Sequence, residues 1–292
     1  DLVAFLRLDL DSINPGFRER AGALFSLSDA GFNSGPDAER MSKTLELALH
    51  PRHYLYVYQS SEPVPEFLLL FGLKRFHTAI NLVLKSRSEN PSSSSDPRIT
   101  RLSSISGIKA PVYHLVFKSG ESAFLAVAPS AILVSNSRRR LDDSLRILQN
   151  NPPLTPPGEK AAALLPVHRK GNLLTGFVLW NSEWTPIAFE TLEYALYDLP
   201  GEEAEKWAGA AKASFYGITI LGEFSGRDQL RIETSSLFTA EKDALLIEQY
   251  FSSFVLPQLK DIPDFYIRQS RTRNRITHEM TFDNLTEMIS DR

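Results

Sequence analysis

Hydrophobic residues recur along this chain with two different periodicities. Alternation with a period of two, and short continuous apolar runs, predict strands, because successive side chains of a strand point to opposite faces. Spacings of three and four predict amphipathic helices. Most predicted strands follow one another through short turns, the connection that antiparallel strands use. The pattern predicts an α+β fold of predominantly antiparallel sheets with helices packed on one face.

The first half of the chain begins with a strand that leads into a helix starting at residues 11–15. It then alternates strands with three further predicted helices. The predicted strands cover residues 3–10, 54–58, 66–73, 112–118, 123–128 and 131–135. One helix is predicted over residues 38–49, ending where Pro51 blocks continuation. A second is predicted from an apolar stripe that should press onto the sheet: Phe76, Ala79, Ile80, Val83 and Leu84. A third, short helix carries Leu141, Leu145 and Leu148 on one side.

The second half repeats this order of elements. Strands are predicted over residues 173–180, 216–223, 229–234, 264–269 and 275–282, with helices through residue 197, over 202–212 and after Thr239. A proline-rich segment, residues 151–158, separates the halves. We therefore predict two pseudo-repeated modules, an N-terminal α+β module at 1–150 and a C-terminal one at 164–292, joined by a linker at 151–163.

Composition places the chain among globular proteins that fold in water. Hydrophobic residues make up 42% and charged residues 23% of the chain, both near the averages for such proteins. No apolar run approaches the roughly 20 residues that span a bilayer, so any membrane anchor would lie outside this chain. The net charge of −3 argues against a nucleic-acid partner. Cysteine is absent, which removes thiolate catalysis and disulfides.

Three largely apolar segments follow one another across most of the chain: residues 3–10 (VAFLRLDL), 131–137 (AILVSNS) and 275–282 (RITHEMTF). They resemble landmarks of a family of exported bacterial proteins of unknown function. The resemblance implies an extracytoplasmic protein, in the periplasm or cell envelope, without an assigned reaction. Asp1 in place of methionine fits a removed signal peptide, although a truncated cytosolic chain would explain it equally.

Two arginine clusters and one tyrosine row are the candidate binding residues. Three cations at the start of a helix are unfavourable, because the helix dipole is positive there. We expect Asp142 and Asp143, a bound anion or an acidic partner to compensate them. The tyrosines form either a recognition surface or a face covered by a helix. The candidate residues are Arg138, Arg139 and Arg140, Arg268, Arg271 and Arg273, and Tyr54, Tyr56 and Tyr58.

The candidate catalytic motifs are incomplete. Asp9-Leu10-Asp11 resembles the nucleophile motif of haloacid-dehalogenase-type phosphohydrolases, which would use Asp142 and Asp143 to hold Mg²⁺. The intervening lysine helix is missing, and the predicted hairpins disagree with the parallel sheet of that family. His50 and His53 lack further metal ligands. We predict no catalytic residues, no metal site and no cofactor.

The sequence thus favours a non-enzymatic, exported or envelope-associated protein that acts by contacts with a protein or an envelope component. An alternative is a module that binds an apolar or lipid-like ligand between sheet and helices, suggested by 18 Phe and 9 Tyr residues. A magnesium-dependent phosphohydrolase is the third interpretation.

Overall fold

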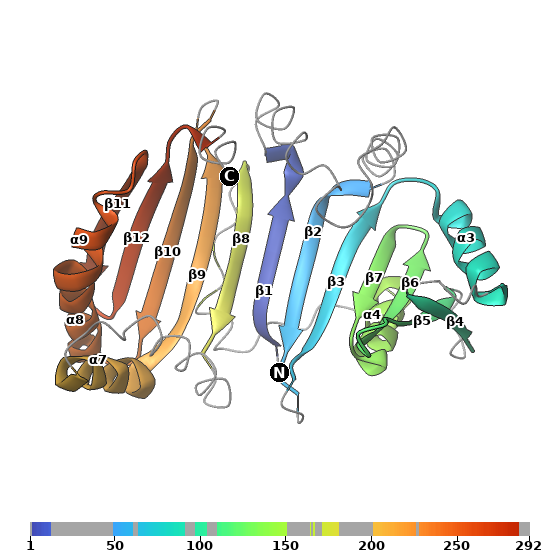
Figure 1. The fold of residues 1–292 in the computed structure, drawn as a ribbon, viewed down its shortest axis with the longest axis horizontal. Helices are drawn as coiled ribbons and strands as arrows, with labels where there is room; N and C mark the ends of the chain where they lie inside the picture. The colour runs from blue at the N-terminus through green and yellow to red at the C-terminus, as the bar shows by residue number, and fades with distance from the viewer. Residues whose placement is uncertain are drawn as a thin grey trace. The chain divides into compact units, whose positions relative to one another are not determined.

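The computed structural model describes residues 2–12, 49–60, 64–90, 97–103, 110–150, 164, 166, 171–180, 201–225 and 228–285. Contacts between Cα atoms divide the chain into two compact units. Unit 1 holds the elements from β1 to α4, and unit 2 holds those from β8 to β12 (Figure 1). The predicted linker at 151–163 and nearly all of the helix predicted at 38–49 lie outside the described residues.

The sheet of unit 1 has the strand order β1-β2-β3-β7-β6-β5-β4, and every neighbouring pair is antiparallel. Its strands are β1 (Leu2–Asp9), β2 (Leu49–Tyr58), β3 (Glu66–Leu73), β4 (Arg98–Leu102), β5 (Val112–Val116), β6 (Ser122–Ala128) and β7 (Ala131–Ser135). A 3-10 turn, η1 (Leu10–Ser12), follows β1. The helices of unit 1 are α3 (His77–Glu89) and α4 (Arg138–Asn150).

The sheet of unit 2 has the strand order β11-β12-β10-β9-β8, again with antiparallel neighbours. Its strands are β8 (Asn172–Leu179), β9 (Phe215–Phe224), β10 (Leu230–Phe238), β11 (Phe265–Thr272) and β12 (Arg275–Phe282). Its helices are α7 (Gly201–Ser214), α8 (Glu241–Tyr250), the π-helical turn η2 (Phe251–Val255) and α9 (Leu256–Leu259). The predicted antiparallel α+β class is therefore confirmed, whereas the pseudo-repeat stays a prediction.

The helices of unit 1 lie on both faces of its sheet. On one face α4 packs in a cluster that includes Leu68, Ala126, Leu133, Leu141 and Leu145. On the other, α3 places Ile80 and Leu84 against Leu73, Val127 and Ile132. Ala126 and Val127 are consecutive on β6, so their side chains point to opposite faces. The expectation of helices on one face is wrong for unit 1, because β6 and β7 are apolar on both sides and need two covers.

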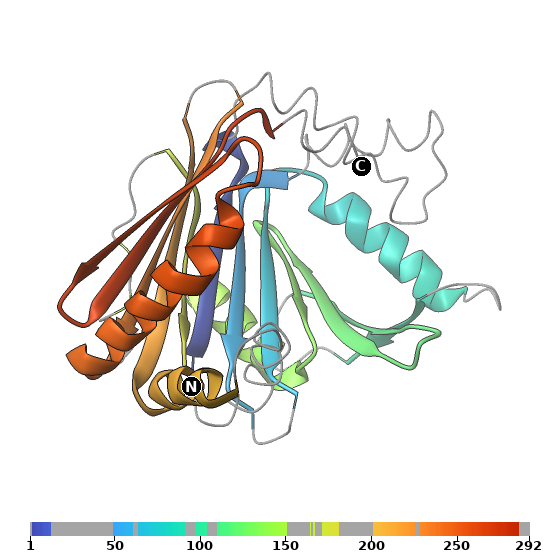
Figure 2. The same ribbon diagram turned by 60° about the vertical axis from the view of Figure 1, so that its left-hand side comes forward.

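The helices of unit 2 cover one face of its sheet (Figures 1 and 2). Ala244 and Ile247 of α8 pack against Phe238 of β10 and Ile276 of β12. The ring of Trp207 in α7 lies 4.0 Å from that of Tyr250 in α8, measured between centroids. Within the described ranges of both units, every helix is too short or too polar to cross a membrane.

Strand β2 starts earlier than expected. Leu49 and Pro51 belong to it, although the pattern predicted that a helix would end there. The proline is tolerated because β1 pairs with β2 only as far as Arg52. On the other side, the register with β3 shifts between Leu49 and His53, and such irregularities are where a strand accepts proline.

Candidate functional site

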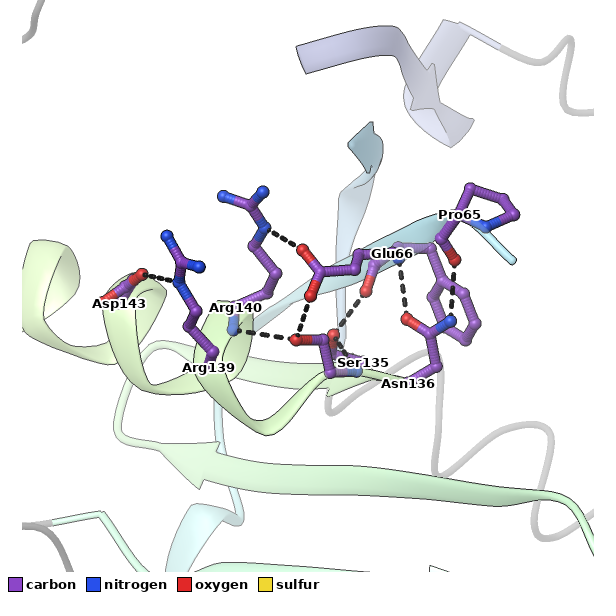
Figure 3. Close-up of polar contacts among 9 residues, drawn as sticks. Pro65, Glu66, Ser135, Asn136, Arg139, Arg140 and Asp143 are labelled. Carbon is purple, nitrogen blue, oxygen red and sulfur yellow. Dashed lines mark hydrogen bonds and ion pairs between the residues drawn. The ribbon is translucent and has the colours of Figure 1, made fainter. Parts of the chain in front are cut away.

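The start of α4 is joined to the start of β3 by hydrogen bonds (Figure 3). Asn136 accepts the N–H of Phe67 at its Oδ1 and donates from its Nδ2 to the carbonyl of Pro65, each over 2.8 Å. The Ser135 hydroxyl donates to the carbonyl of Phe67. The carboxamide of Asn136 thus pairs with β3 as a strand backbone would, where β7 has ended.

Ser137 caps α4 at its N-terminus. Its carbonyl accepts the N–H of Leu141 at 3.2 Å, and its hydroxyl oxygen lies 3.4 Å from the N–H of Arg140. The same hydroxyl donates to Glu66 Oε1 over 2.7 Å. A carboxylate at this end of the helix interacts favourably with the dipole. The cap therefore also places an acid beside the arginines.

Two of the three arginines at this helix start pair within α4. Arg138 Nε lies 2.8 and 2.9 Å from the two carboxylate oxygens of Asp142. Arg139 Nε lies 4.0 Å from Asp143 Oδ2, and its side chain is 79% exposed. Asp142 and Asp143 therefore pair with Arg138 and Arg139, as predicted, but not with Arg140. Arg139 alone of the three presents most of its side chain to solvent.

Arg140 pairs outside its helix. Its Nε lies 2.5 Å from Glu66 Oε2, and its guanidinium lies 4.3 Å from the centroid of the Tyr58 ring. Glu66 is 74 positions away in the chain, so no local pattern could have indicated this partner. Arg138 and Arg140 are thus paired with carboxylates of the same chain, Asp142 and Glu66.

The Glu66 carboxyl group is held in its ionised form. Partial burial by itself would raise its pKa, but the hydrogen bonds from Ser137 and Arg140 and the charges of Arg140 and Arg139 outweigh this effect. The pKa of Glu66 therefore lies below its ordinary value of 4.5. Stability from this network is present above that value and is lost as the pH falls through the lowered pKa.

We expect Glu66→Gln to lower the free energy of unfolding by about 2 kcal/mol at pH 7, because it leaves the largely buried Arg140 without its acid. The loss should shrink as the pH falls below 4.5 and through the lowered pKa of Glu66, because the carboxyl group of the unaltered chain then becomes protonated. Urea denaturation across this pH range measures both. The control is Glu89→Gln, which removes an exposed 3.8 Å pair with Lys85 and should change stability by less than about 0.5 kcal/mol. Equal losses in both variants would contradict the assignment.

The tyrosine row lies on the face of unit 1 that carries α4, and all three side chains are half-buried. The ring of Phe5 lies 5.3 Å from Tyr56 and 6.4 Å from Tyr54, between centroids. Burial, with smaller contributions from Tyr58 and Tyr54, raises the pKa of Tyr56 to about 12. The row is therefore partly covered, and Tyr56 is neutral at physiological pH. Its role in recognition stays a prediction.

The side chains of Arg268, Arg271 and Arg273 do not lie together in the structure. Arg271 Nε lies 2.5 Å from Glu248 and its Nη1 lies 3.3 Å from Glu241, both in α8. Arg268 is three positions away on β11, so its side chain points to the opposite face. Arg273 lies at the turn after β11 with a left-handed φ of 53°, and its carbonyl accepts a hydrogen bond from Arg271. These arginines do not form one anion site.

His278 of β12 is hydrogen bonded. Its Nε2 lies 3.1 Å from Gln269 Oε1, and its ring lies 4.1 Å from Phe251 of the π-helical turn. Burial lowers the pKa of His278 to about 4, so the imidazole is neutral at physiological pH. The His278 ring therefore packs against Phe251 and is held by its hydrogen bond with Gln269.

The acidic motif at the end of β1 is engaged in ion pairs. Asp9 is buried, and its Oδ2 lies 3.0 Å from both Arg7 Nη2 and Arg52 Nε. Burial lowers the pKa of the neighbouring His53, although the Asp9 charge opposes this. The described part of the chain contains no group of three or more His, Asp or Glu side chains that could hold a metal ion. The geometry gives phosphohydrolase chemistry no support.

Helix α3 presents an apolar side to solvent. The predicted orientation of its stripe is confirmed for Ile80 and Leu84 and wrong for Phe76, Ala79 and Val83. Phe76, Leu82 and Val83 are 47%, 61% and 57% exposed. The side that meets the sheet carries Ile80 and Leu84 together with polar His77 and Asn81.

Hydrogen bonds of Asn81 explain the orientation of α3. Its Nδ2 donates to the carbonyl of Val127, and its own carbonyl accepts the Tyr113 hydroxyl, each over 3.2 Å. These bonds turn the Asn81 side of the helix toward the sheet. Phe76, Ala79 and Val83 of the apolar stripe are consequently exposed.

A pocket of about 610 Å³ opens in unit 1 between the start of α3, the end of α4 and the β6–β7 turn. Its lining residues are Ala110, Pro111, Val127, Ala128, Pro129, Leu145 and Leu148, with polar His77, Asn81, Ser130 and Gln149. The Oδ1 atom of Asn81 is buried and has no hydrogen-bond partner within the described part of the chain. The site could not be predicted from the sequence, because its walls come from elements that only packing brings together. The one available signal was Asn81, a polar residue between apolar helix positions.

Comparison of the chain with known protein families, curated proteins and solved structures gave no significant match. The resemblance to exported bacterial proteins therefore stays a prediction. The site's geometry is the basis of the functional proposal.

Proposed function

We propose that this chain is a non-enzymatic protein that binds a partner protein through the outer side of α3. The observation that carries the proposal is the exposure of Phe76, Ala79, Leu82 and Val83 along one side of that helix. Exposed apolar patches with polar rims are typical of interaction surfaces. A partner that covered these side chains would remove them from water, the main favourable contribution to association.

The rim of this surface indicates the chemistry of the partner. Lys74, Arg75 and Arg87 are exposed around it, while Lys85 is paired with Glu89. The rim therefore has an excess of positive charge. Complementary charge steers association and excludes wrong partners. The partner we propose has an apolar patch bordered by carboxylates, and the proposed compartment is the periplasm or the cell envelope.

Photo-crosslinking can test this proposal. A benzophenone amino acid at Val83 should capture one protein, whereas the same group at Ser119, exposed in the turn between β5 and β6, should not. Binding of the purified partner is then measured with Val83→Glu, which should weaken it at least about tenfold, and with Ser119→Glu, which should not. Loss of binding to anionic lipid vesicles in Val83→Glu, without a protein adduct at position 83, would instead indicate a membrane surface and end the proposal.

A further inference from the structure

We propose that the outer edge of β11 in unit 2 binds an acidic, extended segment of another protein as an added antiparallel strand. This edge belongs to the other unit from α3, so the inference does not depend on the partner proposed above. β11 is an end strand, which β12 pairs along all eight of its residues on one side. On the other side, no described backbone is hydrogen bonded to residues 266–272. An end strand of this length can pair with a further strand.

The backbone groups of alternate β11 residues point away from β12. The N–H of Phe265 bonds to the carbonyl of Ile262, which precedes the strand. The carbonyl of Asp264, in contrast, accepts the N–H of Asp283, which follows β12. Groups that point toward the partner strand and groups that point away from it alternate along an antiparallel strand. The residues whose N–H and carbonyl groups point outward are therefore Ile267, Gln269 and Arg271.

The exposed side chains of β11 indicate the chemistry of the added strand. Arg271 is bonded to α8, so Tyr266, which is 61% exposed, and Arg268, also exposed, lie on the other face of the sheet. Glu279 of β12 is directly opposite Arg268, but its carboxylate lies 3.1 Å from Arg231. Among the described residues no acid forms an ion pair with Arg268. A carboxylate on the added strand, opposite Arg268, would supply this partner.

Charge also decides between another protein and a second copy of this chain. The sequence of β11 contains two arginines and no acid. Pairing of two β11 strands would bring like charges together, which is unfavourable, whereas an acidic strand would be attracted. Tyrosine and arginine are also enriched among the residues that contribute most to binding at interfaces. The strand we propose therefore carries carboxylates on one face and apolar residues on the other, which would lie beside half-buried Ile267.

Fluorescence anisotropy of labelled eight-residue peptides, titrated with the full chain, tests the proposal. The peptide TVEVTVEV places glutamate and valine on opposite faces of a strand; we expect it to bind, and TVKVTVKV to bind at least about tenfold more weakly. N-methylation of a central valine, whose N–H would point at β11, should weaken binding at least about tenfold. N-methylation of the threonine next to it, whose N–H would point away, should not. Absence of saturable binding of TVEVTVEV by about 1 mM, or equal or reversed effects of the two methyl groups, would overturn the proposal.

Two substitutions locate the binding. Arg268→Glu should weaken binding of TVEVTVEV about three- to tenfold and strengthen binding of TVKVTVKV, a reciprocal change that loss of folding does not produce. The matched control is Arg98→Glu, at an exposed position of β4, the end strand of unit 1, which should change both affinities less than about twofold. A larger effect of Arg98→Glu would place the peptide on β4, and a dimer of the unaltered chain that the peptide dissociates would assign the β11 edge to a second copy. Either result would overturn the proposal.

Discussion

Leu141→Ala is expected to lower the free energy of unfolding by about 3 kcal/mol. The Leu141 side chain is fully buried between α4 and the sheet, beside Leu133 and Leu145. Its truncation removes apolar contacts and leaves a cavity, since the strands and α4 are held in register by many other residues. Urea denaturation followed by circular dichroism measures the loss.

Ile147→Ala is the matched control for this variant. It lies on the same helix with 52% of its side chain exposed, so less apolar area returns to water and no cavity forms. We expect a loss below about 1 kcal/mol. Should the two variants lose equal stability, α4 would not be packed as described.

Gly217→Ala is expected to cost about 2–3 kcal/mol. A Cβ at this position in β9 would lie against Leu164 Cδ1 and only 2.5 Å from the carbonyl oxygen of Val178 in β8. A leucine tip can move, but the carbonyl belongs to the neighbouring strand. The methyl group therefore has to displace backbone that is fixed by the β8–β9 pairing.

Gly209→Ala separates this crowding from the general effect of replacing glycine. Gly209 lies in α7, where no atom comes within 4 Å of an added Cβ. Alanine there should raise the free energy of unfolding by up to about 1 kcal/mol, because it restricts the unfolded chain and favours the helix. Opposite signs for the two variants are the expected result; stabilisation in both would refute the close approach of β8 and β9.

Strands could be predicted from the sequence where the apolar signal is dense. The run from Glu66 to Leu73 is a strand with the predicted bounds, and Ala131–Ser135 likewise. Short turns between such runs correctly indicated antiparallel pairing. Periodicity alone could not give the rotation of α3, because its apolar stripe is wide and two hydrogen bonds of Asn81 decide which part meets the sheet.

Only part of the candidate site could likewise be predicted from the sequence. The acids that pair with Arg138 and Arg139 lie four positions along the helix, a spacing that sequence reasoning can use. The acid that pairs with Arg140 comes from another strand. The pocket next to Asn81 depends on where α3 begins and α4 ends relative to the β6–β7 turn, which no single segment encodes.

Helices cover both faces of β6 and β7. Few positions in these two strands can therefore accept polar residues. In a sheet with one wet face, every second position accepts polar replacements freely. In β7, Ala131, Leu133 and Ser135 are buried toward α4, while Ile132 packs toward α3. Mutational drift in unit 1 should therefore be slowest at its centre and fastest at β4, the edge strand, where three of five side chains are exposed.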